Sequence, residues 1–204
     1  EPFYTMYDLP FRSGGIRLWR YHGSGLFRNL SVTALNGVEP ILDDAWGSVL
    51  GPGVIRDWSV SRMLPQGFGS DEPLSAARSD GMGWRDAAGD RRGVVNIVSV
   101  DPSEYCRKGV VFAKAVVNVP REGALGFRLT YTDRMSMWLN GRPVFDGEPR
   151  GWHDPGRSEA DGWGRLMPDQ FEAVCEFKPG ANEVLVRLEV KEPLFGSGFW
   201  VRAA

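Results

Sequence analysis

Residues 124–147 contain three short runs in which apolar and polar residues alternate, and this pattern constrains the fold more than any other part of the chain. Alternation with a period of two is typical of a strand that is buried on one face only. Asn140 and Gly141 separate the second run from the third, and this pair favours a two-residue hairpin because both central positions of a type I′ turn need positive φ. The stretch therefore predicts three consecutive strands joined by tight turns, a β-meander.

Further strand-like segments follow the same logic and are separated by Gly- and Pro-rich turns, for which the chain supplies 26 Gly and 14 Pro. In residues 93–100 β-branched side chains follow one another almost without a break, which predicts a strand covered on both faces. One helical turn is predicted at residues 73–78, with Ser70 or Asp71 as its N-cap. Strands are predicted at residues 54–61, 93–100, 110–119, 170–177, 184–190 and 198–202. The predicted fold is all-β, with two facing sheets.

The first 35 residues contain three more predicted strands, at residues 3–9, 16–21 and 26–35. The sequence GGIRLWRYHGSGLFRNLSVTAL, residues 14–35, resembles the last two strands of a concanavalin-like (laminin-G-type) sandwich, as found in family-16-like and keto-disaccharide-hydrolase-type sugar-processing proteins. The remainder of such a sandwich is missing, so the edges of these strands would be open. We expect them to pair with an upstream domain or a partner chain, or to pack on the second unit.

From about residue 50 onward the chain resembles the galactose-binding-like jelly roll. This resemblance implies a jelly-roll β-sandwich, the fold of carbohydrate-binding modules and of accessory domains of glycosidases and sialate-esterase-type enzymes. We therefore divide the chain into an N-terminal β segment, residues 1–40, and a jelly-roll domain, residues 41–204. The matching stretches are Trp58-Ser59-Val60, residues 127–133, Trp138-Leu139-Asn140-Gly141, residues 178–186 and Gly198-Phe199-Trp200.

The charge and hydropathy of the chain exclude some classes of partner. The formal net charge of −2 gives no general attraction to nucleic acid, and no apolar run approaches the roughly 18 residues of a membrane span, so neither nucleic-acid binding nor membrane insertion is expected. No signal peptide is present and the chain starts at Glu1, so we expect a processed product or a fragment, secreted or periplasmic. Cys106 and Cys175 allow either one disulfide or two buried thiols.

Motifs for nucleotide binding and nucleophilic catalysis are absent from the sequence, which has no phosphate loop, no dinucleotide glycine fingerprint, no nucleophile elbow and no Cys-x-x-Cys. His22 and His153 are the only two histidines, too few for a multi-histidine metal site without a partner. The jelly-roll resemblance implies that a structural calcium is held by loop carboxylates, and Asp43, Asp44 and Asp101 are the candidate ligands. No other cofactor is expected.

The densest group of polar and aromatic side chains lies in residues 151–165. Two aromatic rings flanked by charged planar groups can stack on a sugar ring and bind its hydroxyls. The alternative is a long loop attached to the sandwich by its two Trp, with solvated charges. Trp84 lies in a second loop and either joins the binding face or plugs the core. The candidate ligand-binding residues are Trp152, His153, Asp154, Arg157, Trp163, Arg165 and Trp84.

Three functions remain open from the sequence. The first is a non-catalytic carbohydrate-binding or accessory module of a larger saccharide-active protein, whose partner is a carbohydrate. The second is a structural or assembly subunit that pairs through its N-terminal strands with a partner chain or domain. The third is a glycoside-processing enzyme, for which Glu159 and Asp161 are the only carboxylate pair that the sequence suggests, and we assign no catalytic residue.

Overall fold

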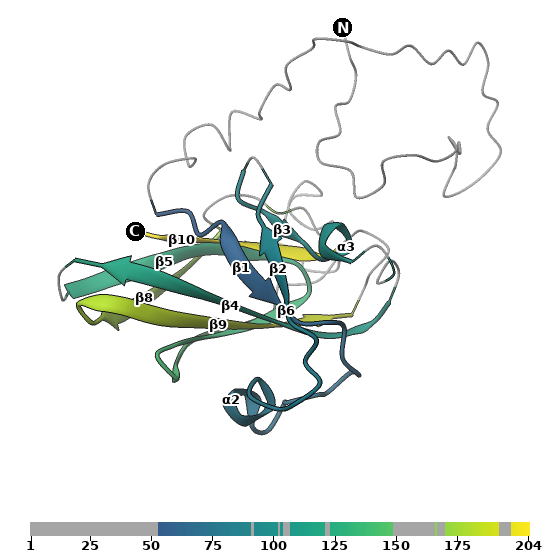
Figure 1. Ribbon diagram of the computed structural model, residues 1–204. Coiled ribbons are helices and arrows are strands. Elements are labelled where there is room, and N and C mark those ends of the chain that lie inside the picture. The colour runs from purple at the N-terminus through teal and green to yellow at the C-terminus, as the bar shows by residue number, and fades with distance from the viewer. Residues whose placement is uncertain are drawn as a thin grey trace, which may run out of the picture.

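The computed structural model describes residues 53–90, 92–101, 103, 107–120, 123–148, 166, 170–191 and 197–204. This part of the chain forms two antiparallel sheets that pack face to face, so the predicted all-β sandwich is confirmed (Figure 1). No helix in the described ranges is long and apolar enough to cross a membrane. The strands predicted before residue 41 and the boundary at residue 40 lie outside the described residues.

The two sheets differ in size. The larger has the strand order β2-β1-β4-β9-β6-β7 and the smaller the order β3-β10-β5-β8. The strands of the larger sheet are β1 (Asp57–Val60), β2 (Arg85–Ala88), β4 (Gly109–Val119), β6 (Arg134–Leu139), β7 (Arg142–Gly147) and β9 (Gly180–Val190). Those of the smaller sheet are β3 (Val95–Asn96), β5 (Gly123–Tyr131), β8 (Phe171–Phe177) and β10 (Gly198–Ala203). Two single-turn helices, α2 (Pro73–Ala76) and α3 (Ile97–Val100), complete the described elements.

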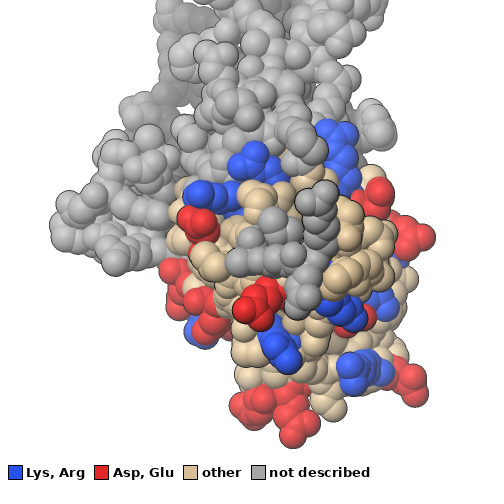
Figure 2. All heavy atoms as spheres, turned by 90° about the vertical axis from the view of Figure 1, so that its left-hand side faces the viewer, with Lys and Arg blue, Asp and Glu red and all other residues tan. Residues whose placement is uncertain are grey.

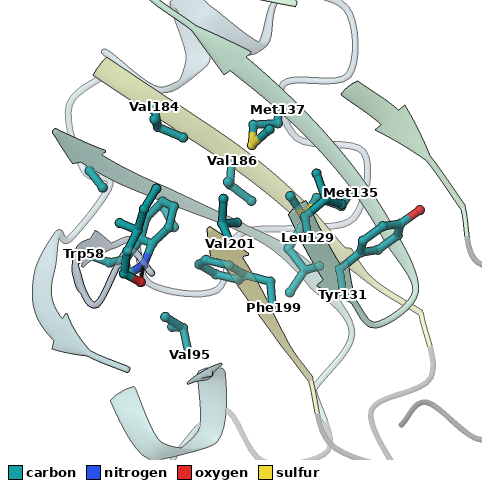
Figure 3. Packing of buried hydrophobic residues seen from close by; sticks show 14 of the residues in the cluster. Trp58, Val95, Leu129, Tyr131, Met135, Met137, Val184, Val186, Phe199 and Val201 are labelled. Atoms are coloured by element: carbon teal, nitrogen blue, oxygen red, sulfur yellow. Dashed lines mark hydrogen bonds between the residues drawn. The ribbon is translucent and has the colours of Figure 1, made fainter. Parts of the chain in front are cut away.

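The core lies between the sheets and is built by the alternating apolar positions that the sequence shows (Figure 3). On β9 the predicted inward side chains are fully buried, at 0% exposure for Val184, Val186, Leu188 and Val190. The ring of Trp58 from the larger sheet packs edge-on against Phe199 from the smaller one, with centroids 4.9 Å apart. Burial of aromatic and branched side chains from both sheets is therefore the main source of stability.

The predicted hairpin at Asn140 and Gly141 is confirmed, because both residues have positive φ, 49° and 79°, between β6 and β7. The predicted three-stranded meander is wrong. β5 belongs to the smaller sheet, so the chain crosses between the sheets at Thr132 and Asp133, where Asp133 has a φ of 55°. β5 and β6 each bury one face in the same core, and alternation alone does not distinguish two strands paired in one sheet from two strands facing each other across the core.

Residues 93–100 do not form the single predicted strand. Only Val95 and Asn96 pair in β3, and the chain then turns into α3. Asn96 causes this change because its side-chain Oδ1 accepts a hydrogen bond from the Val98 N–H at 3.0 Å, which caps the turn. The helical turn predicted at residues 73–78 is present as α2, but the residue before it is Glu72, which makes no side-chain cap, so the predicted caps are wrong.

Asn182 connects two turns at one end of the larger sheet. Its side chain is completely buried, and its Oδ1 accepts hydrogen bonds from Asn140 Nδ2 at 2.8 Å and from the Lys178 N–H at 3.0 Å. Its Nδ2 donates to the carbonyl oxygens of Lys178 and Gly180, at 2.8 and 2.9 Å. All four hydrogen-bonding positions of the amide are therefore used, and the β6–β7 hairpin is tied to the turn that begins β9.

Surface charges of both signs are mixed. On the face shown in Figure 2, acidic and basic side chains are interspersed over the described part of the chain. Exposed ion pairs such as Arg128–Glu172, at 3.1 Å, bring opposite charges together. No broad surface of a single sign therefore forms on the described part of that face.

Cys175 is a buried free thiol on β8. Burial raises the pKa of this thiol from its ordinary value of 9.0 to about 11, because the thiolate is poorly solvated inside the sandwich. Cys106, the other half of the predicted alternative, lies outside the described residues. Of the two alternatives, the structure therefore supports a buried thiol at Cys175.

The raised pKa of Cys175 predicts a loss of stability in alkaline solution. The folded-state pKa lies above the unfolded one, so this group's contribution is complete below pH 9 and is lost as the pH rises towards 11. In a Cys106→Ser background, we expect the free energy of unfolding to fall more steeply over this interval than in Cys106→Ser/Cys175→Ala. Urea unfolding at intervals of half a pH unit measures this. Parallel curves for the two variants would contradict the assignment.

Candidate functional site

The aromatic-rich segment predicted to bind a ligand lies outside the described residues, and so do the candidate calcium ligands Asp43 and Asp44. These positions stay predictions. The unplaced ligand-binding candidates are Trp152, His153, Asp154, Arg157, Trp163 and Arg165, and the carboxylate pair Glu159 and Asp161 is unplaced with them. Of the sequence-predicted site residues, the structure describes Trp84 and Asp101.

Trp84 is half-buried against the outer face of the larger sheet. The Lys114 ammonium group lies over its ring, 4.3 Å from the ring centroid, in a cation–π contact. Trp84 thus packs beside the apolar cluster on that outer face, and its role in ligand binding stays a prediction. The buried members of that cluster are Leu64, Met82, Val110, Phe112, Trp138 and Leu185.

Asp101 is occupied by its own neighbours. One oxygen of its carboxylate accepts hydrogen bonds from the Ser103 hydroxyl at 2.7 Å and the Ser103 N–H at 3.0 Å, and the other pairs with Arg85. The Ser103 hydroxyl, with smaller contributions from the Ser103 N–H and Arg85, lowers the pKa of this carboxyl although partial burial opposes the shift. Among the described residues no group of three or more His, Cys, Asp or Glu is placed to hold a metal ion.

A long connection covers part of the outer face of the larger sheet. We call residues 65–82, which include α2, the cover segment. Its Phe68 ring packs edge-on against Phe112 of β4, with centroids 6.3 Å apart, and Leu74 packs against the same cluster. Figure 1 shows α2 on the side of β4 and β9 that faces away from β10. The cover segment is thus seated on the outer face of the sheet.

A pocket of about 410 Å³ lies between residues 69–73 of the cover segment and strands β6, β7 and β9. We call it the polar pocket. At this size it falls within the range of ligand sites, about 300–1,000 Å³. The cover segment contributes Gly69, Ser70 and Pro73, and the strands contribute Arg134, Ser136, Trp138, Pro143, Phe145, Asp146, Arg187 and Glu189.

Strand register brings these distant residues together. β6 lies between β7 and β9, and Ser136 is opposite Asp146 on one side and opposite Arg187 on the other. Arg134, two residues earlier on β6, is opposite Glu189. Alternate residues of a strand share one face, so the polar side chains of β6 and β9 stand on the outer face while the intervening Met and Val side chains fill the core.

The charged groups of the polar pocket form two pairs. Arg134 Nη2 lies 2.8 Å from Asp146 Oδ2, and the Ser136 hydroxyl donates to Asp146 Oδ1 at 2.7 Å. Arg187 Nη1 lies 3.5 Å from Glu189 Oε2, a longer contact. Each oxygen of the Asp146 carboxylate thus accepts a hydrogen bond, whereas the contact between Arg187 and Glu189 is long for a hydrogen bond.

Arg187 holds donors that the described protein does not use. Its side chain is only 7% exposed, and its Nε donates to the Phe68 carbonyl of the cover segment at 3.1 Å. Among the described residues, no acceptor lies within hydrogen-bond distance of Arg187 Nη2. The indole N–H of Trp138 also has no acceptor among them. A guanidinium carries five N–H donors in a fixed plane, so this buried group can offer paired donors to a ligand.

Two larger depressions lack this combination. One, of about 750 Å³, is formed within and beside the cover segment, where Phe68 is its one aromatic residue. The other, of about 810 Å³, lies beside β1 and β4 and is lined by Asp57, Asp86 and Glu183 together with Lys114, which already contacts Trp84. Of the three, only the polar pocket joins aromatic side chains to two paired guanidinium groups.

Sequence reasoning did not find the polar pocket. Its residues come from positions 69–73, 134–146 and 187–189, and no one of these stretches is dense in functional groups. The sequence does contain one indication of it: polar residues at positions 134, 136, 187 and 189, which alternate with apolar residues of the inner face. That signal becomes a site only when the order of the strands is known, because β6 and β9 are neighbours in space and distant in sequence.

Comparison with known proteins gives partial structural matches only. No protein-family model matches the chain, and no curated protein matches it in sequence. The β-glucosidase of Kluyveromyces marxianus is 14% identical and matches 72% of this chain and 16% of its own, with a TM-score of 0.45. The β-glucuronidase of an uncultured Clostridium sp. is 12% identical over 82% of this chain and 31% of its own, with a TM-score of 0.46. The β-glucuronidase of Ruminococcus gnavus is 14% identical over 74% and 29%, with a TM-score of 0.46. This chain thus spans less than a third of each glycoside hydrolase.

Proposed function

We propose that this chain is a non-catalytic carbohydrate-binding or accessory module of a larger saccharide-active protein, and that the polar pocket contacts the saccharide. The observation that carries the proposal is Arg187, a buried guanidinium with unused donors that lines a pocket together with Trp138. The resemblance of the sequence to galactose-binding-like jelly rolls agrees with this function. It also leads us to propose a secreted or periplasmic location.

The chemistry of the polar pocket suits sugar recognition. Neighbouring hydroxyls of a pyranose can be bound in pairs by one planar guanidinium, which Arg187 provides. The apolar face of the ring needs a flat hydrophobic partner, and Trp138 and Pro143 line the same pocket. The pocket therefore offers both kinds of contact that a sugar ring requires.

The same geometry supports binding in preference to hydrolysis. Glycoside hydrolysis uses two carboxyl groups, one of which donates a proton to the leaving group. In the polar pocket both oxygens of Asp146 already accept hydrogen bonds, from Arg134 and Ser136. Glu189 faces Arg187. These carboxylates are arranged to orient guanidinium groups, which is a task in binding.

We also propose, from the sequence, that Trp152 and Trp163 belong to the contact surface, together with His153, Asp154, Arg157 and Arg165. β7 ends at Gly147, one residue after Asp146 of the polar pocket, so these residues follow a strand of the pocket in the chain. Trp152→Ala and Trp163→Ala examine this part of the proposal separately from the pocket residues.

Titration against a glycan panel tests the proposed function. We expect the full chain to bind at least one glycan, and Arg187→Gln to weaken that binding by about tenfold or more because hydrogen bonds from a charged group are lost. Arg128→Gln, which removes an exposed guanidinium from the smaller sheet, is the matched control and should leave binding unchanged. Thermal melting of each variant separates lost binding from lost folding.

Two results would contradict the proposal. One is the absence of binding to every glycan of the panel. The other is equal binding by the wild type, Arg187→Gln and Ser136→Ala, which would place the contact surface away from the polar pocket.

A further inference from the structure

We infer that the polar pocket selects uncharged sugars over acidic and basic ones. This inference rests on the proposed function and names the ligand class of the same site. It follows from the order of the four charged groups around the pocket, two guanidinium groups and two carboxylates, whose formal charges cancel.

The four charges alternate in space. Strand register places Arg134 opposite Glu189, and it places Ser136 between Asp146 and Arg187. Arg134 is paired with Asp146 at 2.8 Å, and Arg187 faces Glu189 at 3.5 Å. Each guanidinium thus has a carboxylate as its nearest charged partner, and the small Ser136 side chain occupies the centre of the arrangement.

An acidic sugar fits this arrangement poorly. Its carboxylate would have to approach Arg187 to gain an ionic partner, and there it would lie beside the Glu189 carboxylate, which is 3.5 Å from Arg187 Nη1. Like charges at such separations repel appreciably near a protein surface. The other guanidinium, that of Arg134, already forms an ion pair with Asp146 at 2.8 Å. A basic sugar meets the converse problem, because each carboxylate has a guanidinium next to it.

A neutral sugar matches the alternation. Every hydroxyl both donates and accepts, so one ring can accept from Arg187 Nη2 and from the Trp138 N–H while it donates to a carboxylate oxygen. The Glu189 carboxylate has the longer contact with its guanidinium, 3.5 Å against 2.8 Å for Asp146. Glu189 is therefore the carboxylate that we expect to accept a hydrogen bond from the sugar. The volume of about 410 Å³ accommodates a short saccharide.

Matched pairs of sugars test the selectivity. The probes are methyl glucoside against methyl glucuronide, and methyl galactoside against methyl galacturonide, titrated into the full chain by calorimetry at low salt. In whichever pair binds, we expect the neutral sugar to bind about tenfold or more tightly than its uronate. We expect glucosamine, the cationic probe, to bind more weakly than methyl glucoside as well.

Glu189→Gln is the decisive variant. It removes the negative charge beside Arg187, keeps the size of the side chain and retains one acceptor oxygen. We expect it to weaken neutral-sugar binding by about threefold and to strengthen uronate binding by about tenfold, so that the preference between the two largely disappears. Glu172→Gln, on the smaller sheet, removes an equal charge away from the pocket and should leave the preference as it is.

The outcomes separate this inference from the proposed function. Uronates that bind the wild type as tightly as neutral sugars, or a Glu189→Gln protein with an unchanged preference, would overturn the selectivity and leave a carbohydrate-binding module. Failure of every sugar to bind would remove both.

Discussion

Phe199→Ala is expected to lower the free energy of unfolding by about 3–5 kcal/mol, the usual cost of removing a fully buried aromatic ring. Phe199 is at 0% exposure, and its backbone lies in the middle of the smaller sheet between Val95 and Tyr131. Its ring meets Trp58 of the larger sheet edge-on at 4.9 Å, so its loss leaves a cavity where the two sheets contact each other (Figure 3). Denaturant unfolding followed by tryptophan fluorescence measures the change.

Val174→Ala is the control for this prediction. Val174 lies on β8 of the same sheet but is 74% exposed, so we expect its truncation to change the free energy of unfolding by about 0.5 kcal/mol or less. Similar costs for Phe199→Ala and Val174→Ala would mean that the core does not lie between the two sheets.

Asn182→Ala is expected to destabilise the protein by about 2–4 kcal/mol. The substitution removes four hydrogen bonds at once and leaves Asn140 Nδ2, the Lys178 N–H and two carbonyl oxygens without their partner. A buried group left unsatisfied costs about 1–3 kcal/mol, and water reaches some of these turn groups, which reduces the sum. Denaturant unfolding again gives the value.

Asn118→Ala is the matched control for Asn182→Ala, because Asn118 is exposed on β4 directly beside the same turn. We expect a change of about 0.5 kcal/mol or less there. Asn182→Asp adds a second comparison, since it keeps an acceptor and loses both donors, and it should fall between the two. An Asn182→Ala protein as stable as Asn118→Ala would show that the two turns are not held together by this side chain.

The alternation of apolar residues was enough to predict the two sheets. β8 shows why: Ala173, Cys175 and Phe177 are buried and alternate with exposed residues, so the strand can be oriented from its sequence alone. The Asn140–Gly141 turn was equally predictable, because positive φ at both positions leaves few other conformations for that pair.

What the sequence did not reveal is which strands are neighbours. β5 and β6 are consecutive and similar in pattern, yet they lie in different sheets because the chain crosses the core at Asp133. Asn96 ended a β-branched run by capping a helical turn, a local hydrogen bond that outweighs the propensity of the residues after it. Both cases depend on contacts that a one-dimensional pattern does not contain.

The candidate site illustrates the same limit. The sequence predicts a site in residues 151–165, where aromatic and charged residues are close together in the chain, and their role stays a prediction. The polar pocket is made by residues of β6, β7 and β9 that are separated by up to 55 positions, from Arg134 to Glu189. A backbone carbonyl of the cover segment, that of Phe68, accepts a hydrogen bond from Arg187. Pairing of strands, which brings Ser136 between Asp146 and Arg187, was needed to see the pocket.

The most direct measurement of the central claim is the position of a bound sugar on the protein. Amide chemical shifts of the isotope-labelled full chain, titrated with methyl glucoside and methyl galactoside, report that position residue by residue. We predict that the shifts concentrate on residues 67–73, 134–138, 143–147 and 185–189, around the polar pocket. Shifts confined to the depression beside β1 and β4, or to the smaller sheet, would contradict the account.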